Sequence, residues 1–358
     1  MPTTSRSDAM LAALRLVAPG QPLREGLDRI LQARMGALVV VGDGPDVLSI
    51  CSGGFLLDAE FSPQRLSELA KMDGAIILAA DGSRIARANV HLVPDPSVPT
   101  SETGTRHRTA ERVARSLGVP VISVSESRDA ITVYVGNQQR PLLPTAPLLA
   151  RANQGLQTLE QYRNRLTATS AALSALEVED LVTQRDVLNV LQRAETVRRI
   201  AEEIEALIVE LGADGRLVRL QLDELVGGIH DDRALGVRDY LVVEPDWSVE
   251  HALAALDQID GDALLDPRGV ARVIRLTGAA YDPDGPLQPR GFRLLARVPR
   301  LGEDTISQIV EHFGNLQKIM RVTPVELAEV TGMGESRARG VKENLARLAE
   351  SSILDRYS

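Results

Sequence analysis

The sequence predicts a three-part fold: an α/β N-terminal domain, an all-α middle domain and a C-terminal domain of short helices joined by tight glycine turns. Three observations support this division. Short apolar runs rich in Ile, Val and Ala alternate with helical patterns over the first ~140 residues. One apolar helical face then extends from Val187 to Leu211, and a glycine-containing turn between helices occurs twice near the C-terminus. We place the domains at residues 1–145, 146–289 and 290–358.

The N-terminal domain is expected to contain a mixed sheet sandwiched by helices. A helix is expected at residues 23–35, and a second from Pro63 to Lys71, because Ser62 is a typical N-cap and proline suits the first helical position. The expected strands are apolar on both faces, as in a sheet covered on each side. They are 37–41, its expected partner 47–51, 75–80, 119–124 and 130–135.

The middle domain is predicted to be a helical spine. Three prolines between Pro141 and Leu149 indicate a linker, and Ser174 with Glu177 forms a capping-box pattern for the start of the long helix. Gly212 and Gly215 indicate its end. Its apolar face packs either on neighbouring helices of the chain or on another subunit, and both alternatives stay open here.

The composition indicates a globular chain and excludes several classes of protein. With 358 residues and 44% hydrophobic content, the chain can form several cores. It has no stretch of eighteen apolar residues, no apolar leader, and a single cysteine, Cys51, which predicts a cytoplasmic protein. None of its lysines follows a glycine, so a Walker A loop is excluded. HExxH, CxxC and GxSxG motifs are also absent from the sequence.

The charge distribution limits where nucleic acid can bind. A net charge of -9 argues against binding over the whole surface. Residues 290–358 carry eleven basic and nine acidic side chains, a net +2 that leaves -11 for the rest of the chain. The C-terminal domain is therefore the candidate.

The segment GTRHRTAERVARS, from Gly104 to Ser116, predicts an anion site. Its apolar residues have helical spacing, so Arg106, His107 and Arg108 lie near a helix N-terminus, where free N–H groups and the helix dipole favour anions. Guanidinium groups can bind phosphate in a bidentate fashion. Acidic residues are usually preferred in the first turn of a helix, because basic residues there are repelled by the positive end of the helix dipole. A sequence that departs from this preference often does so at a functional site. The alternative is a basic turn paired with the neighbouring acids Glu102 and Glu111.

A carboxylate is expected to face this cationic segment. Asp73-Gly74 directly precedes the strand that begins at Ala75. Taken alone, Asp-Gly is a common turn pair. Together with the basic helix start, it predicts a polyphosphate site that faces an acid.

The C-terminal domain resembles a tandem helix-hairpin-helix DNA-binding module. Its two turns are Val298–Gly302 and Val330–Gly334, and between them Thr323 with Glu326 predicts a capped helix. Small residues let backbone N–H groups approach phosphates closely. Arg300 occupies a position where glycine is expected, and ordinary helix packing is the alternative interpretation. The candidate DNA contacts are Arg300, Gly302, Gly332, Gly334, Arg337, Arg339 and Lys342.

Together these motifs resemble the bacterial DNA integrity scanning proteins, a family of diadenylate cyclases, over the full length of the chain. The resemblance rests on Asp73-Gly74-Ala75, on Gly104–Thr109 and on the C-terminal hairpins. It implies condensation of two ATP into cyclic di-AMP with release of two pyrophosphates, dependent on Mg²⁺ or Mn²⁺. High arginine usage fits a GC-rich organism such as an actinobacterium.

The resemblance also implies roles for single residues. Asp73 is expected to be the catalytic residue and a metal ligand that activates the ribose 3′-hydroxyl. The expected ATP-binding residues are Gly74, Leu92, Thr105, Arg106, His107, Arg108, Thr109, Ser125 and Arg128.

The implied chemistry predicts an assembly, because each site holds one ATP and the product joins two of them reciprocally. Two cyclase domains must then face each other across a two-fold axis, and the family suggests an octamer. Branched DNA, such as a Holliday junction, is expected to lower cyclase activity. Two alternatives are a DNA-binding scaffold that only senses ATP, and a helix-hairpin-helix nuclease, although the sequence lacks the clustered carboxylates of a two-metal nuclease.

Overall fold

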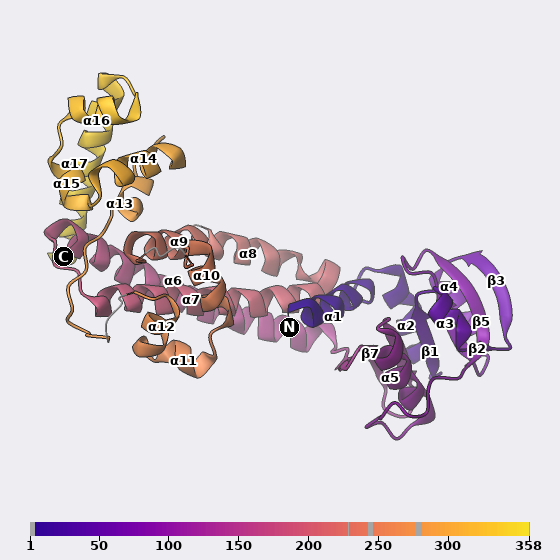
Figure 1. Cartoon of the computed structure of the whole chain (residues 1–358). Coiled ribbons are helices and arrows are strands. Elements are labelled where there is room, and N and C mark those ends of the chain that lie inside the picture. Colours follow the sequence, from indigo (N-terminus) through magenta and orange to yellow (C-terminus); the bar gives the residue numbers. More distant parts are fainter. Residues whose placement is uncertain (1–3, 228, 243–245, 277–280, 358) are drawn as a thin grey trace. The chain divides into compact units, whose positions relative to one another are not determined.

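A computed structural model describes residues 4–227, 229–242, 246–276 and 281–357 (Figure 1). The chain forms two compact units. Unit 1 contains residues 1–154 and 203–221, and unit 2 contains residues 155–202 and 222–358. Helices α6, α7 and α8 therefore contribute to both. None of the helices within the described ranges is both long and apolar enough to cross a membrane.

Unit 1 is built on one mixed eight-stranded sheet, which confirms the predicted fold class. The strand order is β2-β5-β4-β1-β6-β7-β8, and β3 also pairs with β5. Strands β1 and β4 are parallel, and the other pairs are antiparallel. The strands are β1 (Ala37–Val41), β2 (Cys51–Ser52), β3 (Phe55–Glu60), β4 (Ala75–Leu78), β5 (Arg84–Leu92), β6 (Val121–Ser125), β7 (Ala130–Val135) and β8 (Gln138–Pro141).

Apolar side chains cover both faces of this sheet, as the continuous apolar strands predict. In β1, Val39 and Val41 belong to one core cluster, and Leu38 and Val40 belong to the other. The first cluster includes residues of α1 (Thr4–Leu16), α2 (Pro22–Gln32) and α4 (Pro63–Leu69). The second includes residues of α5 (Thr105–Leu117). This helix therefore packs on the opposite face from α2 and α4.

The predicted strand over residues 47–51 is wrong. Residues Pro45–Ser49 form a short helix, α3, with Gly44 as N-cap and proline in the first turn, and only Cys51–Ser52 forms a strand. The apolar pattern favoured a strand, but the proline favours a helix here, because its fixed φ suits the first helical turn. Strands β3, β5 and β8 were not predicted; β3 and β8 are largely exposed, so they lack a buried apolar signal.

The predicted helix start at Ser174 is also wrong. Helix α6 (Thr145–Glu179) continues through this residue, whose hydroxyl donates to the Ser170 carbonyl at 3.0 Å. Helix α7 (Gln184–Leu211) begins later, where the Asp186 carboxylate accepts from the Thr183 backbone N–H and hydroxyl. The break after α7 is confirmed: a 3₁₀ turn, η1 (Gly212–Gly215), starts at Gly212, where φ is +52°.

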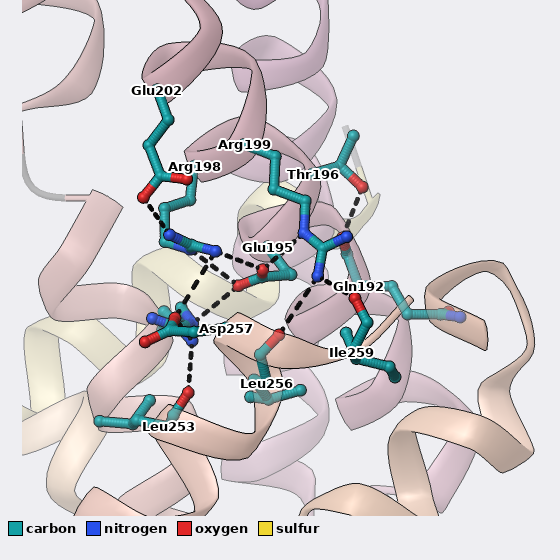
Figure 2. A network of polar contacts seen from close by, with 11 residues as sticks. Gln192, Glu195, Thr196, Arg198, Arg199, Glu202, Leu253, Leu256, Asp257 and Ile259 are labelled. Carbon is teal, nitrogen blue, oxygen red and sulfur yellow. Dashed lines mark hydrogen bonds and ion pairs between the residues drawn. The ribbon is translucent and has the colours of Figure 1, made fainter. Parts of the chain in front are cut away.

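Unit 2 contains a buried polar network that joins several of its helices (Figure 2). Glu195, on α7, is fully buried and forms ion pairs with Arg198, Arg199 and Arg233. Burial raises the pKa of Glu195, but hydrogen bonds from the arginines outweigh this and hold it below its usual value. The Arg199 guanidinium also donates to the Leu256 and Ile259 carbonyls at the end of α10. The neighbouring helices are α8 (Arg216–Val226), α9 (Ile229–Tyr240), α10 (Val249–Gln258), α11 (Gly261–Leu265) and α12 (Pro267–Val273).

The C-terminal helices have their own apolar core within unit 2. The capping box predicted at Thr323 and Glu326 is confirmed, with proline in the first turn. At the start of the first of these helices, the buried Asp239 carboxylate of α9 accepts from the backbone N–H groups of Gly291, Phe292 and Arg293. The helices are α13 (Phe292–Ala296), α14 (Glu303–Phe313), α15 (Leu316–Arg321), α16 (Pro324–Thr331) and α17 (Glu335–Tyr357).

Candidate nucleotide site and DNA interface

The strand register brings the predicted nucleotide-binding segments to one end of the sheet. The parallel pair β1 and β4 begins there, with Leu38 opposite Ala75. The antiparallel strands β5 and β6 end there, since Val90 pairs with Ala75 and Val124 pairs with Ala37. Three segments therefore meet at this end of the sheet: the Asp73-Gly74 loop, the end of β5 and the loop after β6.

The acid and the cationic helix start are in direct contact. Arg106 donates from Nη2 to the Asp73 carboxylate at 2.8 Å. Both side chains are open to solvent, with 46% of Arg106 and 94% of Asp73 exposed. The guanidinium lies against Gly36, where a Cβ would overlap it. The predicted juxtaposition of acid and cation is thus present in the chain.

Two other predicted residues have internal packing roles. A Cβ on Gly74 would collide with the backbone of Asn89, which has a φ of +54°. Gly74 is therefore needed for the approach of β5 to β4, whatever it contributes to a nucleotide. Leu92 lies at the same end of the sheet, but it is 6% exposed and belongs to the α5-facing core cluster.

The first turn of α5 separates its basic residues into two kinds. Arg108 is exposed, and among the described residues its side chain has no hydrogen bond or ion pair. Thr105 is exposed as well, and Thr109 donates to the Thr105 carbonyl at 3.0 Å. His107 is 6% exposed, and burial lowers the pKa of its imidazole. The neutral form of its imidazole is therefore favoured, and His107 differs in this respect from the two arginines beside it.

His107 belongs to a chain of hydrogen bonds that the sequence did not reveal. Its Nδ1 lies 2.9 Å from the Tyr134 hydroxyl, which donates to Glu102 at 3.0 Å. The other carboxylate oxygen of Glu102 accepts from Arg128 at 3.3 Å. Ser125 precedes Arg128 and lies 3.4 Å from its backbone nitrogen. Tyr134 falls at a core position of β7, so only the structure identifies it.

The loop before α5 is fixed to the helix by Glu111. This carboxylate is buried and accepts from the Thr100 hydroxyl and from the Ser101 and Glu102 backbone N–H groups. Burial raises the pKa of Glu111, but these hydrogen bonds outweigh it and lower the pKa overall. Glu102 and Glu111 thus do form ion pairs, as the alternative interpretation expected, but with Arg128 and Arg115. Neither acid forms an ion pair with Arg106, which pairs with Asp73 instead.

A divalent ion fits this site only together with a substrate. The described residues contain no group of three or more His, Cys, Asp or Glu side chains placed to bind a metal. Asp73 contributes one exposed carboxylate. Mg²⁺ commonly uses one or two carboxylates, several waters and substrate phosphates. The donor set therefore suits an ion that is shared with a triphosphate.

The two C-terminal hairpins each have a left-handed residue at the corresponding position. Arg300 has a φ of +62°, and Gly332 at the corresponding position has a φ of +63°. Arg300 thus adopts the left-handed conformation that usually favours glycine, at a cost of about 1–2 kcal/mol. Gly302 is the N-cap of α14, and Gly334 directly precedes α17. Both hairpins accordingly end at an exposed helix N-terminus.

The basic residues near these hairpins are not equivalent. Arg337 and Arg339 are exposed, and Arg337 donates to the Arg300 carbonyl at 2.8 Å, which connects the two hairpins. Lys342 is only partly exposed, and its ammonium donates to the Ile319 and Met320 carbonyls at 3.0 and 2.8 Å. Of the predicted DNA contacts, Lys342 thus has the clearest structural role.

Three family models match consecutive parts of the chain. Residues 24–139 match the nucleotide-binding region of the DisA bacterial checkpoint controller, and residues 142–281 match its linker region. Residues 292–347 match a tandem helix-hairpin-helix. The DNA integrity scanning protein DisA of Streptomyces coelicolor is 54% identical over 97% of this chain and 94% of its own length. The namesake from Kineococcus radiotolerans is 54% identical over the whole of both chains.

These matches agree with the fold and with the motifs at both ends of the chain. The chain belongs to the DNA integrity scanning protein DisA family of diadenylate cyclases, with a nucleotide-binding domain, a helical linker region and a helix-hairpin-helix DNA-binding domain.

Proposed function

We propose that this cyclase joins two ATP molecules at the edge of the sheet where Asp73 meets α5, and that its DNA-binding tail lowers the activity when it engages branched DNA. One observation carries the assignment of the site: an exposed carboxylate and an exposed guanidinium are held 2.8 Å apart at a helix N-terminus. The acid suits a hydroxyl that must lose a proton, and the cation suits a phosphate that gains charge.

Two phosphodiester bonds are formed in the reaction. In each step the 3′-hydroxyl oxygen of one ATP attacks the α-phosphorus of the other, the bond from that phosphorus to the β-phosphate oxygen breaks, and pyrophosphate leaves. Asp73 accepts the hydroxyl proton. Arg106 and Arg108, with the free N–H groups of α5, hold the phosphates and stabilise the leaving group. Thr105, Thr109, Ser125 and Arg128 complete the phosphate contacts, while Gly74 and Leu92 form the nucleoside side of the site.

A divalent ion would be held by Asp73 and the substrate phosphates. When bound, Mg²⁺ or Mn²⁺ neutralises charge on the triphosphate and lowers the pKa of a coordinated hydroxyl. Release of Asp73 from Arg106 would free both groups: the carboxylate would then be able to hold the ion, and the guanidinium would be able to bind the phosphate. An exposed ion pair is worth only about 0–1 kcal/mol, so this exchange is easy.

The product requires two such sites that face each other, since each ATP is both attacker and target. A two-fold arrangement of cyclase domains supplies this, and we propose an octamer built from such pairs. The same proposal places the domain boundaries near residues 145 and 289. It also places the protein in the cytoplasm, which suits an enzyme that uses ATP and chromosomal DNA.

DNA is proposed to bind through the two hairpins. Backbone N–H groups near Gly302, Gly332 and Gly334 would bind phosphates, and Arg300, Arg337 and Arg339 would add charge. Lys342 would act mainly by supporting α15. Contacts to phosphates recognise the shape of the DNA more than its base sequence, which suits branched DNA such as a Holliday junction.

The test is turnover with and without DNA. Full-length protein incubated with ATP and Mg²⁺ should form cyclic di-AMP and pyrophosphate, measured by chromatography, and saturating junction DNA should lower the rate. Asp73→Asn should lower turnover by about 10²–10⁴-fold, the range for a lost acid–base group, and leave the oligomer size unchanged. Persistent synthesis by Asp73→Asn would reject its role, and unchanged turnover with junction DNA would reject regulation by the tail.

A further inference from the structure

The hydrogen-bond directions around His107 fix the position of its proton. The Tyr134 hydroxyl donates its one hydrogen to the Glu102 carboxylate at 3.0 Å, and a carboxylate only accepts. The 2.9 Å contact between Tyr134 and His107 Nδ1 must therefore be donated by the imidazole. Since a neutral imidazole carries one N–H, its Nε2 is an acceptor with a free lone pair.

The surroundings favour the neutral form of this imidazole. Burial is the main cause of its lowered pKa, and the nearby Arg128 and Arg106 oppose protonation further. Glu102 acts in the opposite direction, but it is already bonded to Tyr134 and Arg128. The Tyr134 hydroxyl stays protonated, because burial and the Glu102 carboxylate raise its pKa well above the usual range.

The Nε2 atom is buried and has no hydrogen-bond partner within the part of the chain that the structure describes. Leaving such an acceptor unsatisfied costs about 1–3 kcal/mol, and such groups often have a functional reason. The neighbouring Cδ2 lies 3.4 Å from the position of a Cβ on Gly104, the N-cap of α5. Gly104, which has no side chain, therefore lies close to this edge of the ring.

A free hydrogen-bond acceptor at Nε2 can bind only those groups of ATP that donate a hydrogen bond. Phosphate oxygens at neutral pH only accept, so a neutral Nε2 cannot bind them. The hydrogen-bond donors of ATP are its ribose hydroxyls and its adenine amino group, and of these the ribose adjoins the phosphates. We propose that His107 accepts a hydrogen bond from a ribose hydroxyl of bound ATP through Nε2, with Tyr134 and Glu102 as positioning residues that fix its tautomer.

This inference rests on the proposed nucleotide site and assigns His107 a different role from its two arginine neighbours. Arg106 and Arg108 bind phosphate, while His107 distinguishes the sugar.

Two isosteric variants separate ligand binding from packing. The amide of His107→Asn can still donate to Tyr134 from the Nδ1 position, but it offers nothing at Nε2. His107→Gln places an amide oxygen near the Nε2 position and loses the Tyr134 bond. Tyr134→Phe keeps the His107 side chain but removes the hydroxyl that fixes which ring nitrogen carries the proton. Circular dichroism and light scattering on the full-length variants establish that each is folded and assembled.

The measurement is the dissociation constant for α,β-methylene ATP and for its 2′-deoxy and 3′-deoxy forms, which cannot release pyrophosphate. The wild type should bind one deoxy form about two- to tenfold more weakly, as expected for one neutral hydrogen bond. His107→Asn and Tyr134→Phe should reduce this preference to less than about twofold, and His107→Gln should retain part of it.

The inference is overturned if His107→Asn keeps the wild-type preference against both deoxy forms, or if the wild type has no preference. In those cases the nucleotide site itself still stands, since the analogues bind. Absence of binding by every analogue to the wild type would instead reject the proposed nucleotide site.

Discussion

Two arginine–carboxylate pairs in this chain have similar distances and opposite surroundings. Arg106 and Asp73 are 2.8 Å apart and largely exposed. Arg293 and Glu177 are 2.5 Å apart, with side chains only 3% and 1% exposed. The buried pair receives further hydrogen bonds, since Arg293 donates to Ser170. The difference is therefore in accessibility, not in the contact.

Accessibility decides what each pair can do. The buried pair connects α6 to the first helix of the hairpin domain, and neither partner can leave without exposing a charge to the apolar core. The exposed ion pair is weak, so each of its two groups can leave the other and bind a ligand instead. A short ion pair thus has a structural role in one case and lies at the proposed substrate site in the other.

Breaking the buried pair should have the largest effect on stability. Arg293→Ala removes the ion-pair partner of the buried Glu177 carboxylate, which keeps the hydrogen bond from the Tyr240 hydroxyl, and this should lower the free energy of unfolding by about 3–5 kcal/mol. Arg297→Ala, at an exposed position on the adjacent turn, should change it by less than about 0.5 kcal/mol. Arg106→Ala should behave like this control in stability while losing cyclase activity. Chemical denaturation monitored by circular dichroism measures all three, and similar losses for Arg293→Ala and Arg106→Ala would contradict the comparison.

A smaller effect is expected when Arg106 is displaced but kept. A Cβ in Gly36→Ala would overlap the Arg106 guanidinium and push it away from Asp73. We expect kcat/KM for ATP to fall by about 10- to 100-fold, because a shift of about 1 Å in a positioning group has an effect of this size. Gly44→Ala is the matched control, since a Cβ there meets nothing within 4 Å. Equal activity of the two variants would show that the position of Arg106 is unimportant.

The sequence predicted several of the local elements of unit 1. Continuous apolar strands, the Ser62 N-cap and the basic start of α5 all have local signals, and the structure contains each of them. The contact between Asp73 and Arg106 joins residues 33 positions apart, and it was expected only because both motifs were recognised together.

Other features depend on long-range packing and left no local signal. Burial lowers the pKa of His107, and its ring bonds to Tyr134, 27 residues away, which looks like an ordinary core aromatic. Glu177 fits a capping-box pattern, yet its carboxylate pairs with Arg293, 116 residues away. In both cases burial and a distant partner, not the adjacent residues, determine the role of the side chain.

The central claim is that each new bond uses Asp73 from one subunit and the phosphate-binding arginines of the facing subunit. Mixing Asp73→Asn with Arg108→Ala under conditions that exchange subunits tests it most directly. In a mixed pair, one of the two bonds keeps both its intact acid and its intact arginine, and the other bond lacks both. The linear dinucleotide with one new phosphodiester should therefore accumulate in the mixture and in neither variant alone, as measured by chromatography. If subunits exchange, shown by pull-down with a tag on one variant, and no linear dinucleotide forms, the reciprocal arrangement is wrong.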